Sequence, residues 1–445
     1  MKIRRIIMIA IFALAIVSIV VAAGKKSGKK SAGTNQTQSF ENPPKGNPPD
    51  GMPDDGNPPA KPGEEMSDSN SEPVVVEGAD SITYTYKTSD RITKTYYAKY
   101  LVDGTTLDLS NQTIEVNQSN EIAVLVVNGG TVNLTNCTIV KSGDGAGAKR
   151  DDDYNFYGIN NAVVALGPDS VINMSSCSVN TSGKYANAVF ASDGATINIE
   201  NGITISTTGS SARGLFASYG GTVKAEDGGV KISTQSIHCA ALATDRGGGT
   251  VIVGADKNAS PSILSTVAED SPCIYSTGSI SGWNITGTCT NGQAIVVEGK
   301  NEVALNSCNM TGGRTEQGCI MLYQSSSGDA ADEDASSEKS TLKITDCVFN
   351  ASNGADMFVV THTSAAVSIS GCTFNGISDG QNFISCKKIR WGTGAYLTVD
   401  APDSTLSGTV YADDSNSSVK ISCKKSNLKK AENSDGTVTV NKKSL

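Results

Sequence analysis

The strongest constraint on the fold is a set of aliphatic residues that follow turn residues at intervals of a little over twenty positions. Successive members lie 22 to 30 residues apart, except for two intervals of 40 and 39 residues. The set is Leu107, Val132, Ile172, Ile197, Val223, Val251, Ile280, Val303, Leu342, Val367, Leu397 and Val419. Each long interval contains an insertion, residues 142–157 or 325–340, whose removal restores the common length. Such self-similarity indicates a solenoid rather than several globular domains.

Each repeat unit contains three short strand-like pieces, for example residues 131–134, 137–139 and 162–166, and we expect each to alternate between buried and exposed positions. The 46 glycines and the low aromatic content of 5% suit short strands joined by tight turns. One coil cannot bury its inward face alone, but coils stacked about 4.8 Å apart can. We therefore predict an all-β, right-handed parallel β-helix of about a dozen coils over residues 107–425. Capping strands at 79–106 would precede it, and a Lys-rich tail or cap at 426–445 would follow.

A short sequence pattern that recurs five times, called the five-fold echo, supports this register. Each copy places a cysteine just after a corner of the coil. Its cysteines are Cys137, Cys177, Cys308, Cys347 and Cys372. An exported chain with 11 cysteines could form disulfides, but the odd count and the shared column favour an inward ladder of thiols. Pairs such as Cys308 with Cys319 stay open.

The N-terminus carries an export signal. Lys2, Arg4 and Arg5 precede an apolar run at residues 6–23, so residues 1–24 are predicted to be a signal peptide or an uncleaved membrane anchor. Residues 25–78, rich in Pro and Gly, cannot bury a core and are predicted to be a disordered linker. The expected location is secreted or extracytoplasmic, with any membrane contact made through the N-terminal segment.

The net charge of the chain limits which classes of partner it can bind. A net charge of −9 and a pI near 4.9, without a basic stripe inside the repeats, argue against a nucleic-acid partner. We expect a monomer whose partner is an extracellular glycan or another cell-surface polymer.

Several segments also point to a known family. They are residues 155–160, 211–215, 240–249, 274–278, 297–301 and 321–329. These segments resemble parts of uncharacterised bacterial cell-surface proteins with pectate-lyase-like β-helices, and the resemblance covers roughly Ile114 to Val410. It implies a right-handed parallel β-helix and a cell-envelope location, but no activity, because a fold does not specify a function.

Polar and aromatic side chains recur near the end of the third strand of successive coils, where stacking would gather them on one face. Aromatic rings stack on sugars, while carboxylates and cations bind hydroxyl and uronate groups, so a glycan-binding groove is predicted. The alternative is that turn positions are polar only because they are exposed. The candidate ligand-binding residues are Asp193, Arg213, Tyr219, Asp245, Arg246, Tyr275, Glu298, Lys300, Tyr323 and Gln324.

Both insertions are acidic, which raises the question of a metal. Asp151, Asp152 and Asp153 follow Asp144 in the first insertion, and the second contains Asp329, Asp332, Glu333 and Asp334. Carboxylate oxygens suit Ca²⁺, which is the candidate ion for Asp151, Asp152 and Asp153. Neither insertion has the spacing of an EF-hand, so plain solvated loops are the alternative.

Taken together, these features favour a non-catalytic, glycan-binding or adhesin-like surface protein. The alternative is a polysaccharide lyase using Arg213 or Arg246 as base, with Asp193, Asp245 and Ca²⁺. A structural envelope protein is the second alternative. No catalytic residue is assigned, because the polygalacturonase-type signatures are not present as a set.

Overall fold

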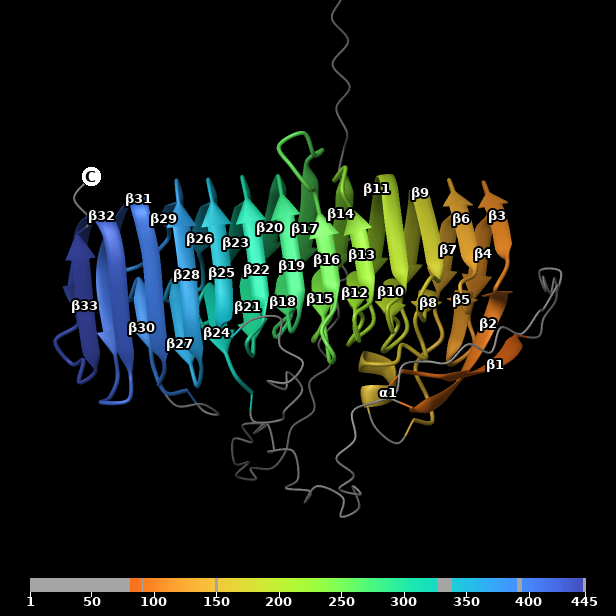
Figure 1. Cartoon of the computed structure of the whole chain (residues 1–445), viewed down its shortest axis with the longest axis horizontal. Coiled ribbons are helices and arrows are strands. Elements are labelled where there is room, and N and C mark those ends of the chain that lie inside the picture. Colours follow the sequence, from red (N-terminus) through yellow and green to blue (C-terminus); the bar gives the residue numbers. More distant parts are fainter. Residues whose placement is uncertain (1–80, 90, 149–150, 326–337, 390–393, 443–445) are drawn as a thin grey trace, which may run out of the picture. The chain divides into compact units, whose positions relative to one another are not determined.

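The computed structural model describes residues 81–89, 91–148, 151–325, 338–389 and 394–442. These residues form 33 strands and one short helix, α1 (Asp152–Asn155). Within the described ranges, strands pair in parallel except for the antiparallel pair β1 (Ile82–Lys87) and β2 (Thr93–Asp103). The chain is therefore all-β, with the long, mostly parallel sheet of a β-helix solenoid (Figure 1).

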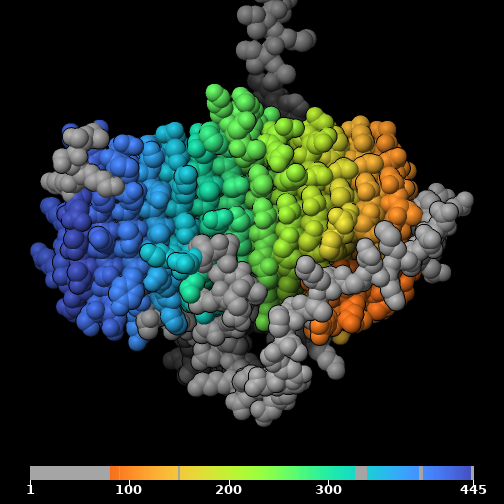
Figure 2. Space-filling view, in the orientation of Figure 1, coloured from red at the N-terminus to blue at the C-terminus, as the bar shows by residue number. Residues whose placement is uncertain are grey.

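The strands fall into three rows, each running from coil to coil. The first row contains β3 (Thr106–Ser110), β6 (Thr131–Thr135), the starts of β9 (Val171–Thr181) and β11 (Thr196–Thr207), β13 (Thr222–Ala225), β16 (Thr250–Val253), β19 (Ser279–Trp283), β22 (Glu302–Asn306), β25 (Ser340–Thr345), β28 (Ser364–Ser370), β31 (Tyr396–Ala412), β32 (Ser418–Lys430) and β33 (Thr437–Lys442). The second row contains β4 (Thr113–Val116), β7 (Thr138–Lys141), the ends of β9 and β11, β14 (Val230–Thr234), β17 (Ser262–Thr266), β20 (Ile285–Cys289), β23 (Asn309–Gly312), β26 (Val348–Ala351) and β29 (Thr373–Asn375). The third row contains β2, β5 (Glu121–Val127), β8 (Val163–Leu166), β10 (Val189–Ser192), β12 (Leu215–Ala217), β15 (Leu242–Thr244), β18 (Ile274–Ser276), β21 (Ile295–Glu298), β24 (Ile320–Tyr323), β27 (Phe358–Thr361), β30 (Ile384–Cys386) and the ends of β31 and β32. Successive coils form adjacent bands in chain order (Figure 2).

The aliphatic repeat aligns in the first row as predicted as far as Val367. The next step is wrong by two residues, because Val367 lies opposite Val399, and Leu397 lies opposite Ala365. Residues two apart on a strand face the same side, so a two-residue shift leaves the inward pattern unchanged and the sequence does not reveal it. The repeat is buried throughout except at Leu107, which is partly exposed in the first coil.

The five-fold echo marks the corner between the first and second rows. In each copy the residue before the cysteine has a φ between 50° and 64°, which turns the chain sharply. Asn, Asp and Gly tolerate this left-handed conformation best, and Ser fills the corner twice. The five corner residues are Asn136, Ser176, Ser307, Asp346 and Gly371. The cysteine that follows is buried in the first four copies and partly exposed at Cys372, so the predicted inward ladder is confirmed at four positions.

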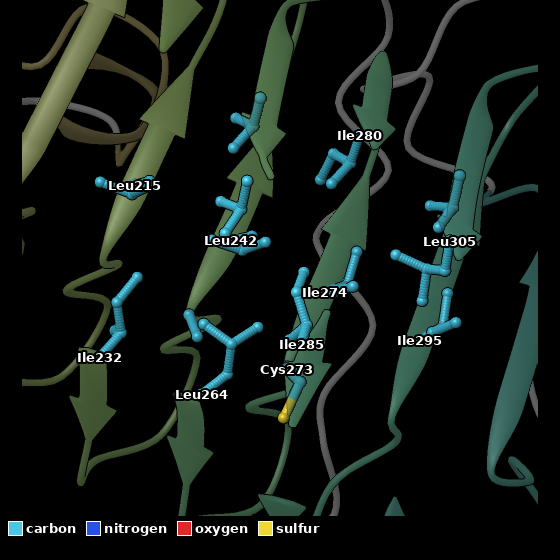
Figure 3. Close-up of a cluster of buried hydrophobic side chains, with 14 of the residues drawn as sticks. Leu215, Ile232, Leu242, Leu264, Cys273, Ile274, Ile280, Ile285, Ile295 and Leu305 are labelled. Atoms are coloured by element: carbon cyan, nitrogen blue, oxygen red, sulfur yellow. The ribbon is translucent and has the colours of Figure 1, made fainter. Parts of the chain in front are cut away.

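The interior is a continuous aliphatic core. Leu215 and Leu242 of the third row, with Ile274 beside them, lie close to Ile232 and Leu264 of the second row (Figure 3). One inward column of the second row is polar instead. It runs from Lys141 through Thr181, Thr207, Thr234 and Thr266 to Cys289. Two of its threonine hydroxyls donate to main-chain oxygens, from Thr207 to Ala212 (3.0 Å) and from Thr234 to Cys239 (2.7 Å), which satisfies these buried polar groups.

The third row differs from the other two because its strands are buried on both faces. In β5, β8 and β10 every residue is buried, so the alternation predicted for residues 162–166 is wrong. Parallel strands covered on both sides read as continuous apolar runs, as these do. The outward column of this row is Leu101, Leu125, Val164, Phe190, Phe216, Ala243, Tyr275, Val296, Met321 and Val359.

Two segments, the β1–β2 hairpin and the first insertion, cover the N-terminal part of this column. The β1–β2 hairpin contributes Tyr86 and Tyr96 to one apolar cluster with Phe190 and Phe216, whose ring centroids lie 4.9 Å apart. The Tyr96 hydroxyl donates to the main-chain oxygen of Tyr157, which follows α1 (2.8 Å). The hairpin and the first insertion are thereby joined over the third row (Figure 1).

The ends of the helix can be compared with the predicted boundaries. The hairpin occupies the region predicted to hold capping strands, and β2 also pairs in parallel with β5 as the first strand of the third row. Pairing continues past residue 425 through β33. The predicted signal or anchor (1–24) and linker (25–78) lie outside the described residues. Within the described ranges, no helix is long and apolar enough to cross a membrane.

Candidate functional site

The predicted ligand-binding residues lie around the ends of third-row strands, but in more than one column. Hydrogen bonds from the Gly194 amide to the Tyr219 oxygen and from the Tyr219 amide to the Arg246 oxygen place Asp193, Tyr219 and Arg246 in equivalent turns. Glu298 lies opposite Tyr323. Tyr275 lies within its strand, opposite Ala243 and Val296. The predicted single column is therefore split, because Tyr275 lies two positions before the register that Glu298 and Tyr323 share.

Three of the predicted residues, Tyr275, Glu298 and Tyr323, form what we call the tyrosine–carboxylate cluster. The hydroxyls of both tyrosines donate to the same oxygen, Oε2 of Glu298, over 2.7 Å in the case of Tyr323. Glu298 is buried, whereas both tyrosines are partly exposed. Burial, with the Glu298 carboxylate next in importance, holds the pKa of Tyr275 well above its usual value, so its phenol stays a proton donor. The shared acceptor therefore fixes the positions of both tyrosine rings through their hydroxyls.

A buried ion pair lies beside this cluster. Arg213 Nη2 is 3.4 Å from Asp245 Oδ2, and both side chains are largely buried. The same guanidinium donates from Nη1 to Asn155 Oδ1 (3.0 Å) and lies 4.7 Å from the ring centroid of Phe216. Asp245 also raises the pKa of Tyr275, behind burial and the two cluster neighbours, which places this carboxylate close to the cluster.

The other predicted residues of the N-terminal half hold the covering segments. Asp193 accepts hydrogen bonds from the Tyr86 hydroxyl (2.6 Å) and the Ser89 amide (3.1 Å), both in the β1–β2 hairpin. Tyr219 stacks on Tyr157, with ring centroids 5.4 Å apart and a hydroxyl contact of 3.1 Å. These side chains contact the chain's own hairpin and insertion.

Three more predicted residues border these groups. The Arg246 guanidinium lies 5.5 Å from the ring centroid of Phe156. Gln324 follows β24 directly, and Lys300 follows β21 after Gly299. Both are partly exposed, and the Gln324 side chain donates to the oxygen of Ser325 (3.4 Å). Lys300 and Gln324 therefore place a cation and an amide at the margin of the tyrosine–carboxylate cluster.

The acidic residues of the first insertion do not converge on one point. Asp153 pairs with Lys94 of the hairpin, and Asp144 accepts the Lys184 amide (2.7 Å). Asp151 accepts the hydroxyl of Tyr185, whose pKa is raised by burial and then by this carboxylate. Among the described residues, including Asp152, no group of three or more His, Cys, Asp or Glu side chains is arranged to hold a metal ion. The acidic residues 329–334 lie outside the described ranges.

Sequence reasoning missed the residues that cover the third row. Tyr86, Asn155, Phe156 and Tyr157 contact the predicted site residues but were not predicted to do so. Two signals were available: third-row strands such as residues 163–166 lack polar alternation, and residues 155–157 carry aromatic rings inside an otherwise acidic insertion. Strands that are apolar on both faces require a cover, and that cover is an aromatic segment.

No protein-family model matches the chain. No curated protein matches it. No solved structure matches it.

Proposed function

We propose that the chain is an exported cell-surface protein that binds glycans without turning them over. The observation that carries this proposal is the pair of tyrosines whose hydroxyls share the Glu298 carboxylate. Rings fixed in this way lose little conformational freedom when a sugar stacks on them, so the binding energy is not spent on ordering them. Lys300 and Gln324 at the margin supply a cation and an amide for carboxylate and hydroxyl groups.

Binding is favoured over a lyase reaction by what the candidate catalytic groups contact. A lyase base must reach the substrate, but the Arg213 guanidinium pairs with Asp245 and donates to Asn155. The Asp193 carboxylate accepts a hydrogen bond from the Tyr86 hydroxyl of the hairpin. Asp193 and Arg213 therefore hold the hairpin and the first insertion on the third row. This supports a rigid binding surface rather than a catalytic centre.

The wider setting of the proposal comes from the sequence. We propose a right-handed coil of the pectate-lyase-like kind, exported by residues 1–24 and held outside the cytoplasmic membrane, as a secreted or membrane-anchored monomer. An acidic chain with net charge −9 suits neutral glycans. A structural envelope protein would have the same fold without a ligand.

The test is retention of the full chain on immobilised glycans, using polygalacturonate, alginate and a panel of neutral polysaccharides, with and without Ca²⁺. Tyr323→Ala is expected to weaken retention at least about fivefold, because truncating an aromatic contact residue at the centre of a binding site costs more than about 1 kcal/mol. Tyr396→Ala is the matched control, because Tyr396 is 57% exposed on β31 and belongs to no part of the cluster.

Each outcome decides between the candidate functions. Retention that depends on Tyr323 but not on Tyr396 supports the binder. Release of ultraviolet-absorbing unsaturated oligosaccharides from a polyuronate would show that the protein is a lyase and overturn the binding proposal. Absence of retention from every glycan, or equal weakening by both substitutions, overturns the proposal in favour of a structural role.

A further inference from the structure

Two buried thiols meet inside the coil at the corner between the second and third rows. Cys289 is the last residue of β20, and Cys273 directly precedes β18. Their sulfurs are 2.8 Å apart, and both side chains are buried in the apolar core, where Figure 3 places Cys273 among Ile274 and Ile285. Non-bonded heavy atoms settle about 3.5–4.0 Å apart, whereas a disulfide joins its sulfurs at about 2.05 Å. The sulfurs are therefore too close for separate thiols and lie at the approach to a covalent bond.

We propose that Cys273 and Cys289 form a disulfide that links consecutive coils. Cys289 lies opposite Thr266, seven positions before Cys273, so the bond would cross from one coil to the next at this corner. Between the two cysteines the chain completes one circuit through β18, β19 and β20. The bond would close that circuit into a ring and fix the spacing of the two coils.

The surroundings of the two sulfurs are apolar and closely packed. Gly287 faces the pair, and a side chain at that position would begin 3.4 Å from the Cys273 sulfur and closer still to Met310. The glycine in β20 therefore accommodates the Met310 side chain beside the Cys273 sulfur. A disulfide in such a dry, apolar position is shielded from small reducing thiols once the coil has closed.

The ladder cysteines contact one another through their side chains, from Cys308 to Cys347 and from Cys347 to Cys372, and they also contact the main chain. Cys308, Cys347 and Cys372 each lie within hydrogen-bond distance of a main-chain oxygen two residues earlier, at 3.2, 3.1 and 3.3 Å. Cys319 is also near Cys289, and burial followed by that neighbour raises its pKa to about 12. Cys319 is therefore the competing partner that an experiment must separate from Cys273.

The chemistry is a two-electron oxidation by thiol–disulfide exchange. The thiolate of one cysteine attacks a disulfide oxidant, either glutathione disulfide or an oxidising thiol–disulfide oxidoreductase, and displaces one of its sulfurs as a thiolate. The second cysteine thiolate then attacks the mixed disulfide and releases the other sulfur of the oxidant. Two cysteine protons are lost, the Cys273–Cys289 bond forms, and the oxidant leaves as two thiols. Burial, and next the contact with Cys289, hold the pKa of Cys273 well above its usual value, so exchange must precede closure of the coil.

The test uses the full chain refolded with glutathione disulfide, then unfolded without reductant and treated with N-ethylmaleimide. We expect nine of the eleven cysteines to be alkylated. Both cysteines fall in the tryptic peptide 258–300, which should remain unlabelled and be lighter by two hydrogen atoms. Reduction before labelling should add two labels to this peptide and lower the urea midpoint of unfolding.

Two variants sharpen the result. Cys289→Ser should leave all ten remaining cysteines labelled, whereas Cys372→Ser, at a partly exposed ladder position, should keep peptide 258–300 unlabelled. Two labels on that peptide in the oxidised unsubstituted chain, or a bond from it to another peptide such as the one containing Cys319, overturns the proposal. If Cys289→Ser does not fold, the mapping of the unsubstituted chain still decides.

Discussion

The first and third rows of strands belong to the same coils and share one core, yet their outer faces have opposite character. In the first part of β9, inward residues are buried and outward residues such as Asn173 are partly exposed. Along β10, the third-row strand of the same coil, all four residues are buried. A first-row strand needs only water on its outside, whereas a third-row strand needs protein.

This difference explains where charged and aromatic groups collect. Outward Asn173 on the first row bonds to its equivalents in neighbouring coils, Asn133 and Asn198, each over 2.7 Å, and forms a simple amide ladder. On the third row, the covering segments meet polar side chains in a partly dry environment, where Asp193 and Arg213 have defined partners. Side chains of the repeat thus acquire individual partners where the hairpin or the insertion packs against the outside of the coil.

The largest effect is expected from truncation on the covered face. Phe190 is fully buried between the third row and the hairpin, so Phe190→Ala should destabilise the chain by about 3–5 kcal/mol. Thr204 lies on an exposed outward position of β11, and Thr204→Ala should change stability by no more than about 0.5 kcal/mol. Urea unfolding followed by circular dichroism measures both. Similar losses for the two variants would remove the distinction between the faces.

The second effect concerns the inside of the coil, at the start of the polar column. Lys141 is fully buried, and burial lowers its pKa to about 8, partly offset by Glu121 and Asp144. In the unfolded chain a lysine has a pKa of about 10.4. Below about pH 8 the folded state bears the full cost of the buried charge. Between about 8 and 10.4 the unfolded chain binds more protons than the folded one, so stability rises with pH.

Lys141→Met should therefore raise stability at pH 7 by up to about 3 kcal/mol and flatten the rise between pH 8 and 10. Glu121 remains satisfied in the variant, because it accepts from Ser81 (2.6 Å) and from the amides of residues 117 and 118. Lys420→Met, at an exposed position of β32, is the control and should leave the pH dependence unchanged. An unaltered slope in Lys141→Met would show that the buried amine stays charged.

The fold could be predicted from sequence because a stacked coil repeats its constraints. Each aliphatic in the first row is supported by equivalents in the coils before and after it, and each corner needs a residue that accepts positive φ, as Asn136 does. The one register error, at Leu397, arose where the period-2 pattern gives the same burial for two alignments.

The candidate site could be predicted only in part because its neighbours lie outside the repeat. Glu298 and Tyr323 share a register position, and the period brings such residues together. Tyr86 reaches Asp193 across 107 residues of sequence, and no period encodes that contact. Strand periodicity also could not show which of the three rows would be covered, since that depends on where the hairpin and the insertion fold back.

The smallest effect tests how the hairpin is held on the third row. Tyr86→Phe removes the hydroxyl that donates to Asp193 but keeps the ring in place. A hydrogen bond to a charged group contributes about 1.5–3 kcal/mol, and the lower end is expected because the Ser89 amide still donates to the same carboxylate. Hydrogen exchange of the β1 amides should accelerate roughly tenfold, since 1.4 kcal/mol corresponds to that factor.

Tyr84→Phe provides the matched control on the same strand. The Tyr84 hydroxyl accepts from the exposed Asn128 amide (2.7 Å), so its loss should change exchange much less. Burial, followed by the contact with Asp193, holds the pKa of Tyr86 above its usual value, so the phenol stays protonated and the difference should persist at alkaline pH. Equal acceleration in the two variants would mean that the rings alone hold the hairpin, and the covered face would then differ from the open one only in apolar area.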